Sequence, residues 1–249
     1  MGCPYKAVLF DVGQTLICTA RSVGEVYAET AAKFGVHVRP DTLNETFSQL
    51  WAERRNSLHA GTNEELERQW WYDLVADSFA CAGLHCEPPR QEFQARFNNF
   101  FDELFDIFTR PETWCVFEDV LPALDKLRAI SLRLAVVSNW DSRLETLLRR
   151  LGFSHQFEFV LTSARAGYRK PDPRIFQAAL ARLGLQAGEV AHVGDSYEDD
   201  FVGATNAGIR PILIDRHQRC PAGIPAIRSL DELPELLTRA KNGNSLAFR

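Results

Sequence analysis

Four apolar runs of the chain, each typical of a buried parallel strand, are followed by polar side chains that could do chemistry. In chain order these side chains are Asp11; Ser138 and Asn139; Lys170; and Asp195 with Asp199 and Asp200. A single loop carboxylate or lysine is usually only solvated. Because the carboxyl ends of parallel strands meet at one edge of a sheet, where ligands bind, we expect these side chains to form one site.

The chemistry that suits this set is displacement at phosphorus. Asp11, at a rigid strand end, can attack a phosphoryl group and form an acyl phosphate, which splits one hard step into two. Because the substrate is itself an anion, cations and donors must offset the repulsion. We expect Lys170 to neutralise the nucleophile and the transferring group. Ser138 and the Asn139 amide would donate hydrogen bonds to phosphoryl oxygens.

Mg²⁺ is the cofactor that these residues predict, because it prefers carboxylate and carbonyl oxygens together with water. Asp11 and Asp195 would supply the carboxylates, and the carbonyl of Gly13 would be a third ligand.

The local sequence favours these placements. Lys170 precedes Pro171, which disfavours a helical conformation for the lysine. Asp172 is then a helix N-cap with Pro173 at the first helical position, so Lys170 is expected in a loop above the sheet. Gly194 is expected to let the backbone turn sharply as Asp195 leaves its strand.

The elements that must position these residues alternate between strand and helix. The predicted strands are residues 7–12, 132–138, 157–162, 190–194 and 211–215, and the predicted helices between them are residues 144–151, 173–183 and 199–207. Such alternation indicates an α/β fold, a Rossmann-like doubly wound parallel sheet covered on both faces.

The segment between the first strand and residue 118 has a different pattern. Residues 23–34 and 93–108 show helical periodicity, and there is almost no strand signal. We interpret residues 17–118 as an inserted, all-helical cap domain, and residues 1–16 with 119–249 as the catalytic core. A lid above the strand ends is useful because its closure expels water. A bundle packed to one side is the alternative.

Composition narrows the class of protein. The 249 residues suffice for a substantial core, and the net charge of −5 argues against nonspecific nucleic-acid binding. No apolar run is long enough to span a membrane, and the first residues do not form a signal peptide. Six scattered cysteines in a chain of this size predict reduced thiols and a cytoplasmic location. Monomer and homodimer both stay open.

Four stretches carry a resemblance to a known family. They are Asp11–Leu16 (DVGQTL), Val137–Asn139 (VSN), Arg169–Phe176 (RKPDPRIF) and Gly194–Asp200 (GDSYEDD). In order and over the whole chain, they resemble the four signature motifs of the haloacid dehalogenase superfamily, with the helical cap in the first insertion position. Two further stretches, Arg68–Trp71 and Leu161–Ser163, are similar to the branch called haloacid dehalogenase-like hydrolase domain-containing protein 3.

The resemblance implies a role for each matching residue. Asp11 would be the nucleophile, Ser138 the phosphate-binding residue, Lys170 the stabilising lysine and Asp195 the metal-binding aspartate. Asp200 matches the second acidic residue of the last motif, which lies behind the metal ligands. The implied activity is a phosphatase acting on a small phosphorylated metabolite through an aspartyl-phosphate intermediate.

One position departs from the phosphatase pattern. Those enzymes usually carry a second Asp two residues after the nucleophile, which protonates the leaving group and then activates water, and here that position is Gly13. Loss of a general acid/base typically costs about 10²–10⁴-fold in rate. Three explanations stay open: a substrate with a good leaving group, another side chain such as Gln14 that positions the water, or a catalytically weak binding protein.

The same departure raises two other chemistries of the superfamily. The 2-haloacid dehalogenases also lack that Asp, but they dispense with metal and lack the paired acidic residues that Asp195 and Asp200 represent here. Phosphonate-cleaving members use a cap lysine as a Schiff base. The cap holds one lysine, Lys33, which is better explained as a favourable charge near a helix carboxyl end.

Overall fold

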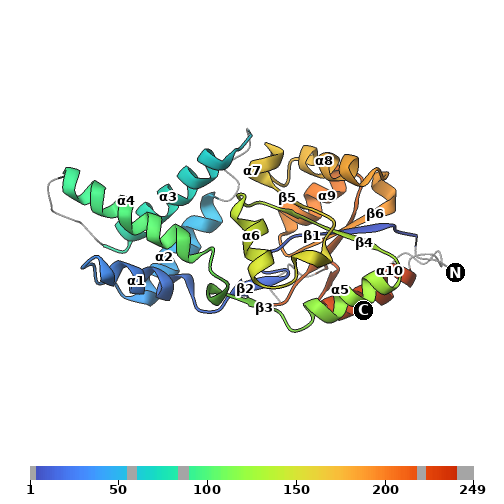
Figure 1. Cartoon of the computed structure of the whole chain (residues 1–249), viewed down its shortest axis with the longest axis horizontal. Coiled ribbons are helices and arrows are strands. Elements are labelled where there is room, and N and C mark those ends of the chain that lie inside the picture. Colours follow the sequence, from blue (N-terminus) through green and yellow to red (C-terminus); the bar gives the residue numbers. More distant parts are fainter. Residues whose placement is uncertain (1–3, 55–60, 84–89, 218–222, 240–249) are drawn as a thin grey trace. The chain divides into compact units, whose positions relative to one another are not determined.

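The computed structural model describes residues 4–54, 61–83, 90–217 and 223–239 (Figure 1). The chain folds into two compact units. Unit 1 comprises Met1–Cys18, Ala60–Asn63 and Val116–Arg249, and unit 2 comprises Thr19–His59 and Glu64–Cys115. All the site residues predicted from the sequence therefore belong to unit 1.

Unit 1 is built on a six-stranded sheet with the order β5-β4-β1-β6-β7-β8, in which every neighbouring pair is parallel. Its strands are β1 (Ala7–Phe10), β4 (Arg133–Ser138), β5 (Val160–Thr162), β6 (Val190–Gly194), β7 (Arg210–Ile214) and β8 (Ala226–Ile227). The central strand β1 pairs with β4 on one side and with β6 on the other, so that Phe10 lies opposite both Val136 and Val193. The residues at the carboxyl ends of these three strands are therefore brought to one place.

The sheet is apolar on both faces because helices cover both. Ala7 and Leu9 of β1 share one core cluster with Ile175 and Phe176, while Val8 and Phe10, whose side chains point the other way, are also fully buried. Figure 1 shows α8 and α9 on one side of the sheet and α5 and α10 on the other. This is the α/β, doubly wound architecture that the sequence predicts.

Unit 1 contains α5 (Val120–Ala129), α6 (Arg143–Arg150), α7 (Ser163–Ala166), α8 (Pro173–Leu183), α9 (Gly203–Asn206) and α10 (Leu233–Arg239). Short 3₁₀ turns lie at Ser154–Gln156, Ala187–Glu189 and Leu230–Glu232. Helix α8 occupies the predicted residues. Asp172 caps it by accepting a hydrogen bond from the Arg174 amide at 2.9 Å, and Gly184 ends it in the left-handed conformation.

The predicted helix over residues 199–207 is present, but it is an α-helix only in its second half. The chain forms a π-helix, Tyr197–Val202, followed by the short α9. The wider π turn accompanies a carboxylate that turns back: Asp200 accepts a hydrogen bond from the Ser196 amide at 3.0 Å. The predicted strand over residues 157–162 is also shorter than expected, since β5 begins at Val160.

Unit 2 is helical, with α1 (Val23–Lys33), α2 (Pro40–Arg54), α3 (Glu64–Cys81) and α4 (Arg90–Ile107), followed by a 3₁₀ turn at Pro111–Thr113. Its core is aromatic: Tyr27 stacks on Phe79 with ring centroids 6.1 Å apart and meets Phe47 edge to face. Phe97 and Phe101 are buried in the same core, as their helical spacing predicts.

Two short strands were not predicted. They are β2 (Ile17–Thr19) and β3 (Trp114–Val116), which form a separate two-stranded sheet. The chain passes from one unit to the other within each of these strands. Over the part of the chain that the structure describes, no helix combines the length and the apolar character needed to cross a bilayer.

Candidate active site

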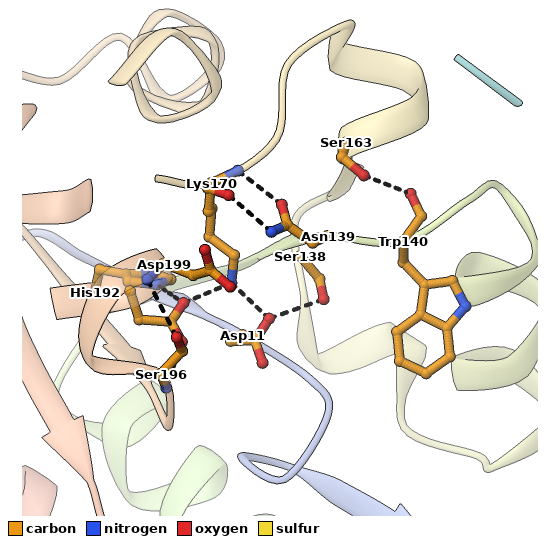
Figure 2. Close-up of polar contacts among 10 residues, drawn as sticks. Asp11, Ser138, Asn139, Trp140, Ser163, Lys170, His192, Ser196 and Asp199 are labelled. Carbon is orange, nitrogen blue, oxygen red and sulfur yellow. Dashed lines mark hydrogen bonds and ion pairs between the residues drawn. The ribbon is translucent and has the colours of Figure 1, made fainter. Parts of the chain in front are cut away.

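Asp11 lies at the carboxyl end of the central strand. Its backbone N–H donates to the Val193 carbonyl at 2.9 Å, which continues the pairing of β1 with β6 by one residue. The side chain is buried, and its Oδ1 accepts hydrogen bonds from Ser138 Oγ at 2.8 Å and from Lys170 Nζ at 2.6 Å (Figure 2). Ser138 and Lys170 lie 127 and 159 positions after Asp11 in the sequence, yet both side chains donate to the same oxygen of its carboxylate.

Lys170 is held in a loop, as predicted, and Asn139 is the residue that holds it. The Asn139 side chain donates to the Lys170 carbonyl at 2.9 Å and accepts from the Lys170 amide at 2.7 Å. Lys170 is joined to Pro171 by a cis peptide bond. The Asn139 side-chain amide is therefore engaged in positioning the lysine.

Asp200 forms the other side of the lysine's environment. Its Oδ1 accepts from Lys170 Nζ at 2.5 Å and is hydrogen-bonded to His192 Nε2 at 2.8 Å, while its Oδ2 accepts from the Ser196 amide. Both carboxylate oxygens therefore have donors inside the protein. His192 is fully buried on β6, and its ring packs edge to face against Phe176.

Gly194 has a different role from the one that the sequence suggests. Its φ is not positive, so the residue is not needed for a left-handed turn. A Cβ at this position would instead lie 2.1 Å from Cγ of Asp200, far inside any permitted contact. The glycine leaves the space that the Asp200 carboxylate occupies.

The electrostatics of the site are those of three carboxylates around one ammonium group. Burial raises the pKa of Asp11, and Lys170 only partly opposes this. Burial raises the pKa of Asp195 much further, and the charges of Asp11 and Asp200 add to the effect. Burial also acts against the charged form of Lys170, but the two carboxylates outweigh it and the pKa of the ammonium group is raised.

Asp200 and His192 complete this charge pattern. Burial opposes the ionisation of Asp200, yet Lys170 and the hydrogen bond from His192 prevail and lower the pKa of the carboxyl group well below its ordinary value. Burial lowers the pKa of His192, which favours the neutral imidazole. Lys170 and Asp200 therefore form a fixed ion pair, and Asp11 shares the ammonium group with it.

An acidic cluster at this edge has the composition of a divalent-cation site. Carboxylate oxygens of Asp11, Asp195 and Asp200 lie within 4.8 Å of one another. Hard oxygen donors of this kind suit Mg²⁺. Since both oxygens of Asp200 already accept hydrogen bonds, Asp200 fits the lysine. The buried Asp11 and the partly exposed Asp195 are the carboxylates that fit a cation.

Gly13 lies two residues beyond Asp11, at the start of the loop that leads to β2. Its φ is not positive, and a Cβ placed on it would meet only Cζ3 of Trp140, at 3.8 Å, among described atoms outside its chain neighbours. Trp140 follows the Ser138–Asn139 pair, and its carbonyl accepts hydrogen bonds from Ser163 Oγ at 3.1 Å and from the Ala164 amide. An aromatic ring, rather than a polar group, thus borders the glycine.

Direct hydrogen bonds join Asp11, Ser138 and Lys170, and Asn139 is bound to the lysine's backbone (Figure 2). Lys170 is also hydrogen-bonded to Asp200. Asp199 is partly exposed, and its amide donates a hydrogen bond to Ser196 Oγ at 3.2 Å. Sequence reasoning missed His192 and Trp140. His192 could have been identified from the sequence, because it interrupts an otherwise apolar strand, Val190–Gly194.

Comparison with known proteins agrees with this geometry. A family model described as haloacid dehalogenase-like hydrolase matches residues 5–208. The chain belongs to this family. It is therefore a hydrolase.

Individual relatives support the same placement. The chain is 37% identical to haloacid dehalogenase-like hydrolase domain-containing protein 3 of Danio rerio, over 95% of this chain and 98% of the relative, which confirms the resemblance to that branch. A crystal structure of a HAD phosphatase from Thermococcus onnurineus is 26% identical with a TM-score of 0.65, covering 93% of this chain and 97% of the other. A 2-haloacid dehalogenase from Pseudomonas syringae is 29% identical with a TM-score of 0.61, covering 95% and 99%.

Proposed function

We propose that the protein is a Mg²⁺-dependent phosphohydrolase that acts on a small phosphorylated metabolite, with Asp11 as its nucleophile. The observation that carries the proposal is the environment of Asp11. Its carboxylate is buried at a strand end, and a serine hydroxyl and a lysine ammonium group both donate to Oδ1. A carboxylate fixed in this way can be aimed at phosphorus with little loss of freedom during reaction.

Each residue has a part in a two-step reaction. A carboxylate oxygen of Asp11 forms a bond to phosphorus while the bond to the leaving oxygen breaks. Lys170 and Ser138 stabilise the negative charge on the transferring group, together with the Asn139 backbone N–H. Water then attacks phosphorus, which returns the Asp11 carboxylate and releases inorganic phosphate. Asp200 contributes by holding the lysine in its charged form.

Mg²⁺ would be held by Asp11, Asp195 and the carbonyl of Gly13. When bound, it would supply positive charge to the phosphoryl oxygens. The raised pKa values of Asp11 and Asp195 support this assignment, since for both carboxyl groups the neighbouring positive charge is too small to offset desolvation and the other carboxylates.

Gly13 narrows the substrate class. A glycine cannot protonate a leaving group, and the adjacent indole of Trp140 supplies no acid. The proposed substrates are therefore those whose leaving group departs without a proton, such as acyl phosphates and activated aryl phosphates. We propose that unit 2 forms most of the cap domain predicted over residues 17–118 and that this cap sets the remaining specificity. The exposed cysteines Cys81 and Cys115, which form no disulfide, support a cytoplasmic location.

A 2-haloacid dehalogenase is the second candidate, favoured by the similarity to the Pseudomonas syringae enzyme and by the absence of an acid at residue 13. In this reaction Asp11 would displace halide from carbon, and no metal would be required. The clustered carboxylates of Asp195 and Asp200 favour the phosphohydrolase instead. The phosphonate-cleaving alternative loses support, because Lys33 forms an ion pair with Glu103 at 2.7 Å.

The test is hydrolysis of p-nitrophenyl phosphate and acetyl phosphate, with Mg²⁺ and with EDTA. We expect metal-dependent turnover that falls by at least about 10³-fold in Asp11→Asn. Asp125→Asn is the matched control, because Asp125 is an exposed aspartate on α5 whose carboxylate accepts a hydrogen bond from Gln156, away from the site. Chelator-resistant halide release from 2-chloropropionate would support the dehalogenase. Failure in both assays would leave a binding protein.

A further inference from the structure

Arg216 is a buried arginine at the carboxyl edge of the sheet, two residues beyond the end of β7. Its Nε and Nη2 both donate to the Thr15 carbonyl, at 3.2 and 2.8 Å. Its Nη1 and Nη2 donate to the two carboxylate oxygens of Asp119, at 2.9 and 3.0 Å. The guanidinium carbon lies 3.9 Å from the ring centroid of Phe117, and the side chain is only 9% exposed. Every one of these contacts lies within unit 1.

The Asp119 carboxylate is fully engaged in hydrogen bonds with Arg216 and its surroundings. It occupies the N-cap position of α5, but its side chain makes no capping hydrogen bond with that helix. Its Oδ2 instead accepts from Ser229 Oγ at 2.9 Å and from the Leu230 amide at 2.7 Å, in addition to Arg216. The bidentate pair of Arg216 and Asp119 therefore links the segments that follow β1, β7 and β8. Asp119 consequently does not cap α5, although such a cap typically contributes about 1 kcal/mol to stability.

The Thr15 carbonyl belongs to the loop that carries the nucleophile. In the nucleophile loop, residues 11–17, the amides of Thr15, Leu16 and Ile17 all donate to the Val12 carbonyl, at 3.3, 2.8 and 3.0 Å. Gln14 adopts a φ of +57°, which costs a residue with a side chain about 1 kcal/mol. The loop is thus closed on itself in a strained turn, and the Arg216 contact fixes it from outside.

We propose that Arg216 is a positioning residue that holds the nucleophile loop in its reactive conformation. The inference rests on the proposed phosphohydrolase function. Asp11 itself is anchored by β6 through the Val193 carbonyl. The brace therefore acts mainly on the loop beyond it, whose Gly13 carbonyl would be a ligand of the cation in the proposed function. Loss of the brace should therefore weaken activation by Mg²⁺ more than it lowers the rate at saturating metal.

The test compares Arg216→Lys and Arg216→Gln with Arg133→Lys and Arg133→Gln. Arg133 is a matched control because it makes a similar set of bonds at the opposite edge of the sheet: two to the Glu158 carboxylate, at 2.7 and 2.6 Å, and one to the Leu183 carbonyl at 2.7 Å. A lysine keeps the charge at either position but cannot reproduce the planar, bidentate geometry. The Lys variant also guards against a loss of folding in the Gln variant.

Two readouts are needed. The first is amide hydrogen exchange at Thr15, Leu16 and Ile17 without metal, which requires no turnover. The second is the Mg²⁺ concentration that half-saturates p-nitrophenyl phosphate hydrolysis. We expect both the exchange rates and this concentration to rise about tenfold in the Arg216 variants and to stay unchanged in the Arg133 variants.

Unchanged loop exchange in folded Arg216→Lys would overturn the brace, as would an equal response of the Arg133 variants. If the wild type exchanges slowly in the loop but hydrolyses no phosphate ester, the proposed function fails while the exchange comparison still decides the brace. If the wild type is active and Arg216→Lys has normal metal dependence, the positioning role is refuted and the proposed function stands.

Discussion

The substitution Gly13→Asp tests whether the glycine limits the chemistry of this enzyme. The backbone at Gly13 has no positive φ, and a Cβ there would make only an ordinary van der Waals contact, 3.8 Å from Cζ3 of Trp140. An aspartate should therefore be tolerated with a change in unfolding free energy below about 1 kcal/mol. Two residues beyond Asp11, the new carboxyl group would stand where the related phosphatases carry their acid/base.

The expected gain depends on the leaving group. A positioned general acid contributes about 10²–10⁴-fold, which corresponds to about 2.7–5.4 kcal/mol of barrier at about 1.36 kcal/mol per tenfold. An alkyl phosphate such as glycerol 2-phosphate needs a proton on its leaving oxygen, so Gly13→Asp should raise its kcat/KM by at least about 100-fold. Acetyl phosphate loses a weakly basic acetate, so its rate should change by less than about tenfold.

The assay measures phosphate release from both substrates with saturating Mg²⁺ between pH 5 and 8. Gly13→Asn has nearly the same shape as Gly13→Asp but cannot transfer a proton, and Gly13→Ala reports the effect of the Cβ alone. The thermal midpoint of each variant checks that the site is intact. If a folded Gly13→Asp hydrolyses glycerol 2-phosphate no faster than Gly13→Asn, the reasoning that Gly13 marks a missing acid is wrong.

Two further predictions concern stability. Gly194→Ala places a Cβ 2.1 Å from Cγ of Asp200, so we expect urea denaturation to show a decrease of about 2–3 kcal/mol in the unfolding free energy. The control Gly188→Ala, whose Cβ meets nothing within 4 Å, should leave the unfolding free energy almost unchanged. Equal effects of the two substitutions would show that the contact with Asp200 is not the cause. Burial opposes ionisation of Asp119, but hydrogen bonds led by that from Arg216 outweigh it and hold the pKa of the carboxyl group below its ordinary value. This stabilisation is present above the unfolded pKa of about 4 and is lost as the pH falls through the folded value. The unfolding free energy of the wild type should therefore exceed that of Asp119→Asn at pH 7, and the difference should shrink as the pH falls below about 4. A difference independent of pH would contradict the assignment.

The parallel sheet could be predicted from the sequence because each of its strands is buried on both faces. A run such as Val190–Gly194 is then largely apolar and is bounded by glycine, which fixes its end. Helix α8 was equally predictable, since Asp172, Pro173 and Gly184 mark both of its ends locally. The strand ends in turn indicated which polar residues would meet.

The features that could not be predicted depend on contacts between distant segments. The π turn at Tyr197–Val202 arises where the Asp200 carboxylate turns back toward Lys170, a partner 30 residues away. Arg216 and Asp119 are 97 positions apart, and neither lies in a recognisable motif. The sequence suggests a turn at Gly194, because the local pattern does not show that Asp200 packs against this glycine in space.

The charge of the site indicates why the proposed phosphoryl transfer would need both a cation and a lysine. Asp11, Asp195 and Asp200 carry three negative charges, and Lys170 carries one positive charge, so the buried cluster has a net charge of 1 − 3 = −2 when all are ionised. Neutral His192 does not change this sum. A phosphoryl group approaching such a cluster would be repelled, whereas Mg²⁺ bound by Asp195 and Asp11 would bring the sum to zero and let the ammonium group act on the substrate. Because Asp200 holds Lys170 in the charged state, the lysine keeps its proton when Asp11 becomes phosphorylated and no longer offers a full negative charge. In our proposal the second carboxylate of the last motif, Asp200, would therefore be needed for the chemistry even though it reaches neither the metal nor the substrate.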